Sequence, residues 1–268
     1  GPRDWSSDVC SSDLWVECGK KACPCWRAGF SAWYGRRSGA VNTLTLGRSG
    51  LRASRLAYGC WRIAETADIA RTVGRRAVVA AFEAGYTLFD LADIYCGGES
   101  ERLFGSVLAQ VGGMRAGVLI ATKCGIRLAG EPSPAAPFRY DFSAGHIIAS
   151  CEGSLRRLGV DVIDLYQLHR PDWLMDPSEV AGAFEQLQRQ GKVREFGVSN
   201  FRPSQVSALQ KACPMRLVVN QVEISLACRE RFEDGTLDQC VGEGITPMAW
   251  RSEEHTSELQ SRGLISYA

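Results

Sequence analysis

Short apolar runs alternate with amphipathic segments along the chain from Val41 onward. The runs read LAYGCWRI, TLFDLA, VLIATK, VIDLYQLH, VREFGVSN, LVVNQVEI and ITPMAW, and the last of them ends at Trp250. Strand-length runs separated by helical patterns are typical of βαβ units with a parallel sheet. The pattern therefore predicts an α/β protein with seven parallel strands.

The amphipathic segments carry signals for where helices begin and end. RRAVVAAFEAG has its apolar residues at helical spacing and stops at Gly85, a residue suited to a helix C-terminus. SAGHIIASCEGSLRRLG begins with Ser143 as a candidate N-cap and ends at Gly159. DPSEVAGAFEQLQRQGK has Pro177 in its first turn and Gly191 at its end. These segments predict the helices that connect the strands.

Ahead of the first long run, VNTLTLGRSGLRASRL alternates around a Gly-Arg-Ser-Gly turn, which predicts a β-hairpin. Two α/β architectures are compatible with the seven runs. Against a doubly wound sheet, no glycine-rich dinucleotide fingerprint comes after the first strand. In favour of a barrel, polar residues recur at the carboxyl ends of several different strands. We therefore expect a barrel.

Composition excludes several classes of function. With 45% apolar and 23% charged residues, the chain is ordinary for a soluble globular protein. Its net charge of +1 and the lack of a clustered basic stripe argue against a nucleic-acid partner. No stretch approaches the ~18 apolar residues of a membrane helix. We expect a cytoplasmic protein without a membrane partner.

The 11 cysteines do not predict a metal site. Cys18, Cys23 and Cys25 lie close together but lack a second pair at zinc-site spacing. The cysteines after Val41 are scattered, and we expect them to pack as small buried hydrophobic residues in a reducing compartment.

The two ends of the chain are related in an unexpected way. Arg251–Ser261, RSEEHTSELQS, can be back-translated into a DNA string whose reverse complement, read one base in, encodes Asp4–Leu14, DWSSDVCSSDL. Two unrelated tails should not be opposite-strand readings of one oligonucleotide, so we interpret both as translated sequencing-adapter DNA and leave them out of fold reasoning. We expect three parts: residues 1–40, adapter-like and unassigned; residues 41–250, the barrel; and residues 251–268, an adapter-like tail.

Four polar side chains stand at or just past the ends of apolar runs: Asp90, Tyr95, Lys123 and His169. Taken singly, each has an ordinary structural explanation, such as a loop cap, a packed aromatic ring, a solvated lysine or a core histidine. Taken together, each at its own strand end, they make a candidate proton-transfer site.

The motifs that hold these residues occur in the order FDLADIY, ATKCG, LYQLH, GVSNF and NQVE, and they resemble those of the aldo-keto reductases. The resemblance covers roughly Val41 to Trp250. It implies an incomplete (β/α)8 TIM barrel of about seven strands, with the hairpin capping its closed end. It also implies NADPH-dependent reduction of an aldehyde or ketone to an alcohol.

Carbonyl reduction needs a proton donor and a group that stabilises the developing oxyanion. The resemblance assigns Tyr95 as donor, because Asp90 and Tyr95 have the family's five-residue spacing. A free tyrosine titrates near ~10, and the Lys123 ammonium is expected to lower that pKa. Asp90 would hold Lys123, and His169 would hydrogen-bond the substrate oxygen.

The resemblance also implies a cofactor site. Ser199, Asn200 and Gln221 match the residues that hold the nicotinamide carboxamide, whose donors and acceptors a hydroxyl and two amides can satisfy. Trp250 aligns with the aromatic residue on which the nicotinamide ring stacks. Trp61 is a candidate for lining the substrate pocket. Strand-end turn chemistry and ordinary burial are the structural alternatives for these residues.

After Trp250 the chain departs from the family, whose eighth strand and phosphate-binding segment are replaced by Arg251–Ala268. We therefore expect a truncated barrel that binds NADPH poorly. Two alternatives to an active reductase stay open: a cofactor-binding regulatory subunit on the same fold, and an inactive fragment lacking the cofactor phosphate site. A further difference is Cys96, a thiol next to Tyr95 that could be oxidised or alkylated.

Overall fold

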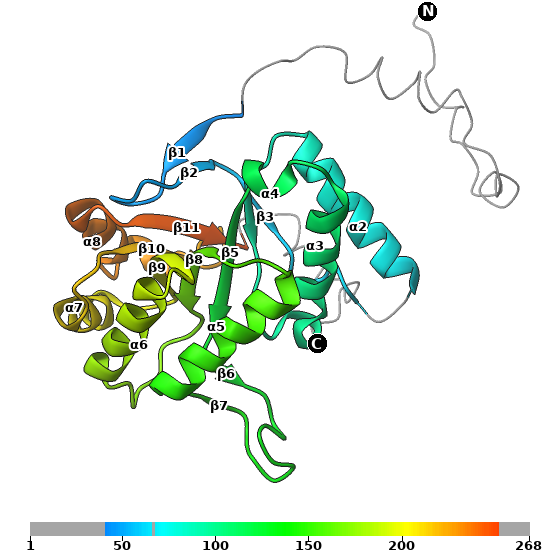
Figure 1. Ribbon diagram of the computed structural model, residues 1–268. Helices are drawn as coiled ribbons and strands as arrows, with labels where there is room; N and C mark the ends of the chain where they lie inside the picture. Colours follow the sequence, from blue (N-terminus) through cyan, green and yellow to red (C-terminus); the bar gives the residue numbers. More distant parts are fainter. Residues whose placement is uncertain (1–40, 66–67, 252–268) are drawn as a thin grey trace, which may run out of the picture. The chain divides into compact units, whose positions relative to one another are not determined.

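The computed structural model describes residues 41–65 and 68–251 (Figure 1), so the expectations for residues 1–40 and 252–268 lie outside the described part. Its centre is a parallel sheet of seven strands. They are β3 (Ala57–Gly59), β4 (Leu88–Asp90), β5 (Leu119–Cys124), β8 (Ile163–Leu168), β9 (Val193–Ser199), β10 (Leu217–Glu223) and β11 (Thr246–Trp250). All seven apolar runs form the strands that the sequence predicts.

The strand order confirms the predicted incomplete barrel and is not that of a doubly wound sheet. The sheet reads β11-β10-β9-β8-β5-β4-β3, so each strand pairs in parallel with the next strand of the sheet along the chain. A doubly wound sheet reverses its strand order at a switch point, and this sheet has no such reversal. Within the described residues, β3 and β11 are the two edges.

Helices follow the strands and cover the outer face of the sheet (Figure 1). They are α2 (Asp68–Glu83), α3 (Glu99–Gln110), α4 (Met114–Gly117), α5 (Ala144–Leu158), α6 (Pro177–Arg189), α7 (Pro203–Ala212) and α8 (Thr236–Glu243), with short 3-10 turns η2 (Tyr95–Gly98) and η3 (Glu230–Phe232). The predicted boundaries of α5 are confirmed. Ser143 Oγ accepts from the His146 amide at 3.4 Å, and Gly159 ends the helix with φ 66°. No helix of the described part is long and apolar enough to cross a membrane.

The predicted hairpin forms from β1 (Thr43–Thr45) and β2 (Arg52–Ser54) and closes one end of the sheet. Three apolar residues of the hairpin, Leu46, Leu51 and Ala53, pack against residues from the starts and middles of the strands. These are Leu88, Ala121, Leu165, Val218 and Val219. The Gly47 amide also donates to Thr246 Oγ1 at 2.7 Å. A second hairpin, β6 (Ile126–Arg127) and β7 (Arg139–Tyr140), lies at the opposite end (Figure 1).

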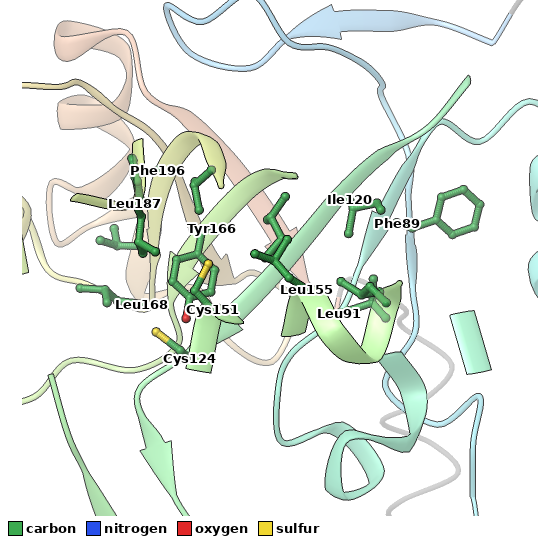
Figure 2. Packing of buried hydrophobic residues seen from close by; sticks show 14 of the residues in the cluster. Phe89, Leu91, Ile120, Cys124, Cys151, Leu155, Tyr166, Leu168, Leu187 and Phe196 are labelled. Carbon is green, nitrogen blue, oxygen red and sulfur yellow. The ribbon is translucent and has the colours of Figure 1, made fainter. Parts of the chain in front are cut away.

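The main core lies between the sheet and its helices (Figure 2). Phe184 of α6 stacks on Phe196 of β9 with ring centroids 4.2 Å apart. Tyr166 of β8 is fully buried beside Cys124 and Cys151, and its hydroxyl donates to the Ile147 carbonyl at 3.0 Å. Five described cysteines are buried as free thiols, as expected for small core residues: Cys60, Cys124, Cys151, Cys213 and Cys240.

Helices α3 and α5 pack closely at Gly105, where a Cβ atom would lie 2.4 Å from the Leu158 carbonyl oxygen. We expect Gly105→Ala to lower the free energy of unfolding by about 1–3 kcal/mol, because the backbones must separate. The matched control is Gly182→Ala in α6, where an added Cβ atom would meet no described atom within 4 Å. This variant should raise the free energy of unfolding by about 0.5–1 kcal/mol. Urea unfolding measures both, and equal effects would contradict the close packing.

Candidate active site

The predicted site residues lie together at the carboxyl ends of the parallel strands. Asp90 ends β4, Tyr95 lies in the turn after it, Lys123 is near the end of β5, and His169 directly follows β8. Ser199 ends β9, Asn200 follows it, Gln221 is in β10, and Trp250 ends β11. Carboxyl ends of parallel strands meet on one rim of a barrel, which is where barrel active sites form.

Lys123 is the centre of the cluster. Its side chain is buried, and its Nζ donates to both carboxylate oxygens of Asp90 and to the Leu91 carbonyl, each at 2.8 Å. A fourth contact of 3.2 Å joins Nζ to the Tyr95 hydroxyl. A buried ammonium is tolerated only when it is paired and hydrogen-bonded, and this geometry meets both conditions. The structure thus brings together the Tyr, Lys and Asp that the sequence predicts.

The pKa directions within this cluster follow from burial and charge. Burial lowers the pKa of Lys123, but the Asp90 carboxylate and Tyr95 outweigh it, so the net pKa is raised and the ammonium stays charged. For Tyr95, burial raises the pKa, and Lys123 lowers it by a smaller amount. Lys123 does lower the Tyr95 pKa, as the sequence predicts, but burial and the Asp90 carboxylate raise it more, so the net pKa lies above its ordinary value. Tyr95 carries its proton throughout the neutral range.

His169 lies against Tyr95, with ring centroids 5.7 Å apart and ring planes at 77°. Its backbone amide donates to the Cys124 carbonyl at 2.8 Å, which anchors it at the end of β5. The pKa of the imidazole is well below its ordinary value, first because of burial and then because of the positive charges of Lys123 and Arg170. The ring is neutral, and its buried Nδ1 has no hydrogen-bond partner in the described part of the chain.

The predicted nicotinamide residues form one connected hydrogen-bond chain. Trp250 Nε1 donates to Asn200 Oδ1 at 3.1 Å, and Asn200 Nδ2 donates to Ser199 Oγ at 2.8 Å. Ser199 Oγ donates to the Gln221 carbonyl at 2.9 Å, and Gln221 Nε2 donates to Asp90 Oδ2 at 3.1 Å. Asn200 has φ 62°, a left-handed conformation that asparagine adopts more readily than most residues. These hydrogen bonds connect Trp250 with the Asp90 carboxylate.

Gln167 is a site residue that the sequence reasoning missed. It is fully buried in β8, and its Nε2 donates to Gln221 Oε1 at 3.3 Å. Its own Oε1 is buried without a partner among the described residues. The available signal was a lone amide inside the apolar run VIDLYQLH, since a buried polar side chain needs a reason to be there.

Two arginines flank the predicted stacking residue Trp250. The guanidinium carbon of Arg170 lies 5.2 Å from the ring centroid and that of Arg251 lies 5.6 Å from it. Both distances are within the range of cation–π attraction, which holds the indole at the rim.

Trp61, the candidate for lining the substrate pocket, lies beside Tyr95. Its side chain is 45% exposed, and its ring centroid is 6.4 Å from that of Tyr95. Its carbonyl accepts from Cys96 Sγ at 3.2 Å and from Ser100 Oγ at 3.3 Å. These contacts join the segment after β3 to the turn that bears Tyr95.

We expect Lys123→Met to lower the free energy of unfolding by about 3–5 kcal/mol, because it leaves the Asp90 carboxylate buried without its cation. Adding Asp90→Asn should restore part of the loss. The matched control is Lys192→Met, which removes a half-exposed partner of Glu152 and should cost about 0–1 kcal/mol. Similar losses in the two single variants, measured by urea unfolding, would contradict the buried pair.

Comparison with known proteins agrees with this geometry. The pattern of the Aldo/keto reductase family matches residues 55–256. The 6-dehydroglucose reductase of Agrobacterium fabrum is 43% identical over 201 residues, which cover 75% of this chain and 68% of that protein.

Two solved structures share the fold. The aldo-keto reductase AKR11C1 from Bacillus halodurans (holo form) has a TM-score of 0.68 at 30% identity, covering 78% of this chain and 65% of that one. The glycerol dehydrogenase AKR11B4 from Gluconobacter oxydans has a TM-score of 0.69 at 31% identity, covering 78% and 63%. The chain thus spans about two thirds of the length of these relatives. By its matched pattern, its strand order and its relatives, the chain belongs to the aldo/keto reductase family of oxidoreductases.

Proposed function

We propose that this chain carries the active site of an NADPH-dependent reductase that converts an aldehyde or ketone to an alcohol. The observation that supports it most is the set of contacts at Lys123 Nζ, which bonds the Asp90 carboxylate and the Tyr95 hydroxyl at once. This arrangement presents a protonated phenol next to a fixed positive charge, which is what a carbonyl oxygen needs as it gains negative charge.

Tyr95 supplies the proton in this proposal. The phenol carries its proton at neutral pH, so Oη has a proton to donate. As the proton leaves, the phenolate that remains is stabilised by Lys123 Nζ at 3.2 Å. Asp90 keeps that ammonium in place through its two 2.8 Å contacts. A positioned general acid of this kind contributes about 10²–10⁴-fold to the rate.

His169 orients the substrate in this proposal. A neutral imidazole can donate one hydrogen bond to a carbonyl oxygen without repelling the nearby Lys123 ammonium. Its Nδ1, which has no partner among the described residues, and its position against the Tyr95 ring support this role. Trp61, whose ring centroid lies 6.4 Å from that of Tyr95, would bound the space in which the carbonyl compound lies.

The residues present fit a nicotinamide. Ser199, Asn200 and Gln221 are joined by hydrogen bonds. Gln167 Oε1, buried and without a partner in the described part of the chain, adds an acceptor beside Gln221. When bound there, with Trp250 against its ring, the cofactor would supply the hydride. The link from Gln221 to Asp90 would keep the amide group in a fixed relation to the proton donor.

The substrate class is proposed as a small carbonyl compound, including sugar-derived aldehydes. The names of two relatives, a 6-dehydroglucose reductase and a glycerol dehydrogenase, support a hydroxylated substrate. The first test is fluorescence titration of the chain with NADPH, followed by NADPH oxidation with simple aldehydes and with 6-dehydroglucose. Binding with oxidation supports the proposal. Binding without turnover favours a regulatory subunit, and no binding favours an inactive fragment.

We expect Tyr95→Phe to lower kcat by about 10²–10⁴-fold while leaving the NADPH dissociation constant nearly unchanged, because only the proton donor is lost. The matched control is Tyr140→Phe in the exposed β6–β7 hairpin, which lies outside the Lys123 cluster and should retain activity. Steady-state kinetics and the same titration measure both effects. Equal turnover by the Tyr95 variant and the native chain would exclude Tyr95 as the donor.

A further inference from the structure

The turn that bears Tyr95 has an unusual backbone. The three residues after it have φ values of 50° at Cys96, 63° at Gly97 and 87° at Gly98. A cysteine in the left-handed region is uncommon, and such a conformation persists only when its surroundings hold it. The position of the proposed proton donor therefore depends on the residues that pack against this turn.

Glu101 of α3 lies beneath the turn and is fully buried. Its Oε1 accepts from Thr122 Oγ1 at 2.6 Å, and its Oε2 accepts from Arg157 Nε at 2.6 Å. Thr122 directly precedes Lys123 in β5. The carboxylate thus connects the helix that follows the turn, the strand of the catalytic lysine and helix α5.

Arg157 of α5 supports the turn by direct packing. A Cβ atom on Gly98 would lie 2.9 Å from Arg157 Cδ, so the arginine stem runs against the last residue of the turn. Its Nη2 also donates to Ser154 Oγ at 3.1 Å, which fixes the guanidinium on α5. Gly98 is also the N-cap of α3, so Arg157 packs at the residue where the turn joins that helix.

Asp93 is the third member of the cluster and stands two residues before Tyr95. Its amide donates to the Lys123 carbonyl at 3.0 Å, and its Oδ1 is buried without a partner in the described residues. Burial, followed by the neighbouring Glu101 carboxylate, raises the pKa of Asp93 to about 7, against the opposing charge of Arg157. Ser150 and the Ile94 amide hydrogen-bond to it, and buried Cys124 and Tyr166 face it from β5 and β8.

Two carboxyl groups in this cluster share one arginine. Arg157 balances Glu101 at 2.6 Å, so an ionised Asp93 would leave one buried negative charge unbalanced beneath the turn. We infer that Asp93, Glu101 and Arg157 position Tyr95 by fixing the turn that bears it, and that this support is complete only when Asp93 is uncharged. The catalytic consequence rests on the proposed function, whereas the support itself is a property of the fold.

The direction of the pH effect follows from charge. A carboxyl group whose pKa is raised on folding stabilises the folded state below its unfolded pKa and loses that contribution as the pH rises through its folded pKa. For Asp93 the loss occurs as the pH rises toward and through about 7. The turn should therefore loosen in mildly alkaline solution.

Cys96 provides a readout that needs neither cofactor nor turnover. Its thiol lies on the turn, half-exposed and held to the Trp61 carbonyl at 3.2 Å. We would measure its alkylation by iodoacetamide with peptide mass mapping, between about pH 6 and about pH 8.5, in the full chain and in Asp93→Asn. The ratio of the two rates at each pH removes the part of the pH dependence that comes from ionisation of the thiol itself. Cys228, also half-exposed but remote in sequence, is the internal control.

We expect the native-to-Asp93→Asn rate ratio to rise severalfold with pH at Cys96 and to stay flat at Cys228. Glu101→Gln should speed Cys96 alkylation at every pH, whereas Glu152→Gln on the exposed face of α5 should not. A flat ratio at Cys96 would overturn the inference, and it would do so even if Glu101→Gln failed to fold. Failure to oxidise NADPH would count against the proposed function alone, because alkylation is measured without it.

Discussion

The buried ammonium of Lys123 is the interaction on which the rest of the site depends. Removing such a charge from water costs several kcal/mol, and among the described residues the Asp90 carboxylate, the Leu91 carbonyl and the Tyr95 hydroxyl offset that cost. Each partner comes from β4 or the turn after it, so pairing Lys123 also fixes β4 against β5. Asp90 then accepts from Gln221 across the sheet, which connects the proton-transfer residues with the proposed nicotinamide residues.

Most of the architecture could be predicted because it depends on local pattern. The seven strands and the ends of α5 follow from apolar periodicity and from capping residues such as Ser143 and Gly159, whose effects act within a few positions. The rim of polar residues could be predicted for a related reason. Asp90 and Lys123 stand at strand ends, and parallel strands bring those ends together whatever the connecting helices do.

The features that could not be predicted depend on packing between distant segments. The sequence indicated that Lys123 would affect the Tyr95 pKa, but the net direction is decided by burial, which only the assembled sheet and helices determine. The Glu101–Arg157 pair joins residues 56 positions apart and appears in the sequence as two ordinary helix charges. Gln167 was overlooked because an amide in an apolar run has meaning only once its neighbour Gln221 is known.

The contact between Gly47 and Thr246 has a consequence for the order in which the molecule assembles. Every strand of the main sheet pairs with neighbours close in sequence, so those pairings can form progressively as the chain leaves the ribosome. The hairpin is made early, yet its amide at Gly47 bonds a residue 199 positions later. This hydrogen bond between the hairpin and β11 can therefore form only after β11 has been synthesised, which makes it a late contact in biogenesis.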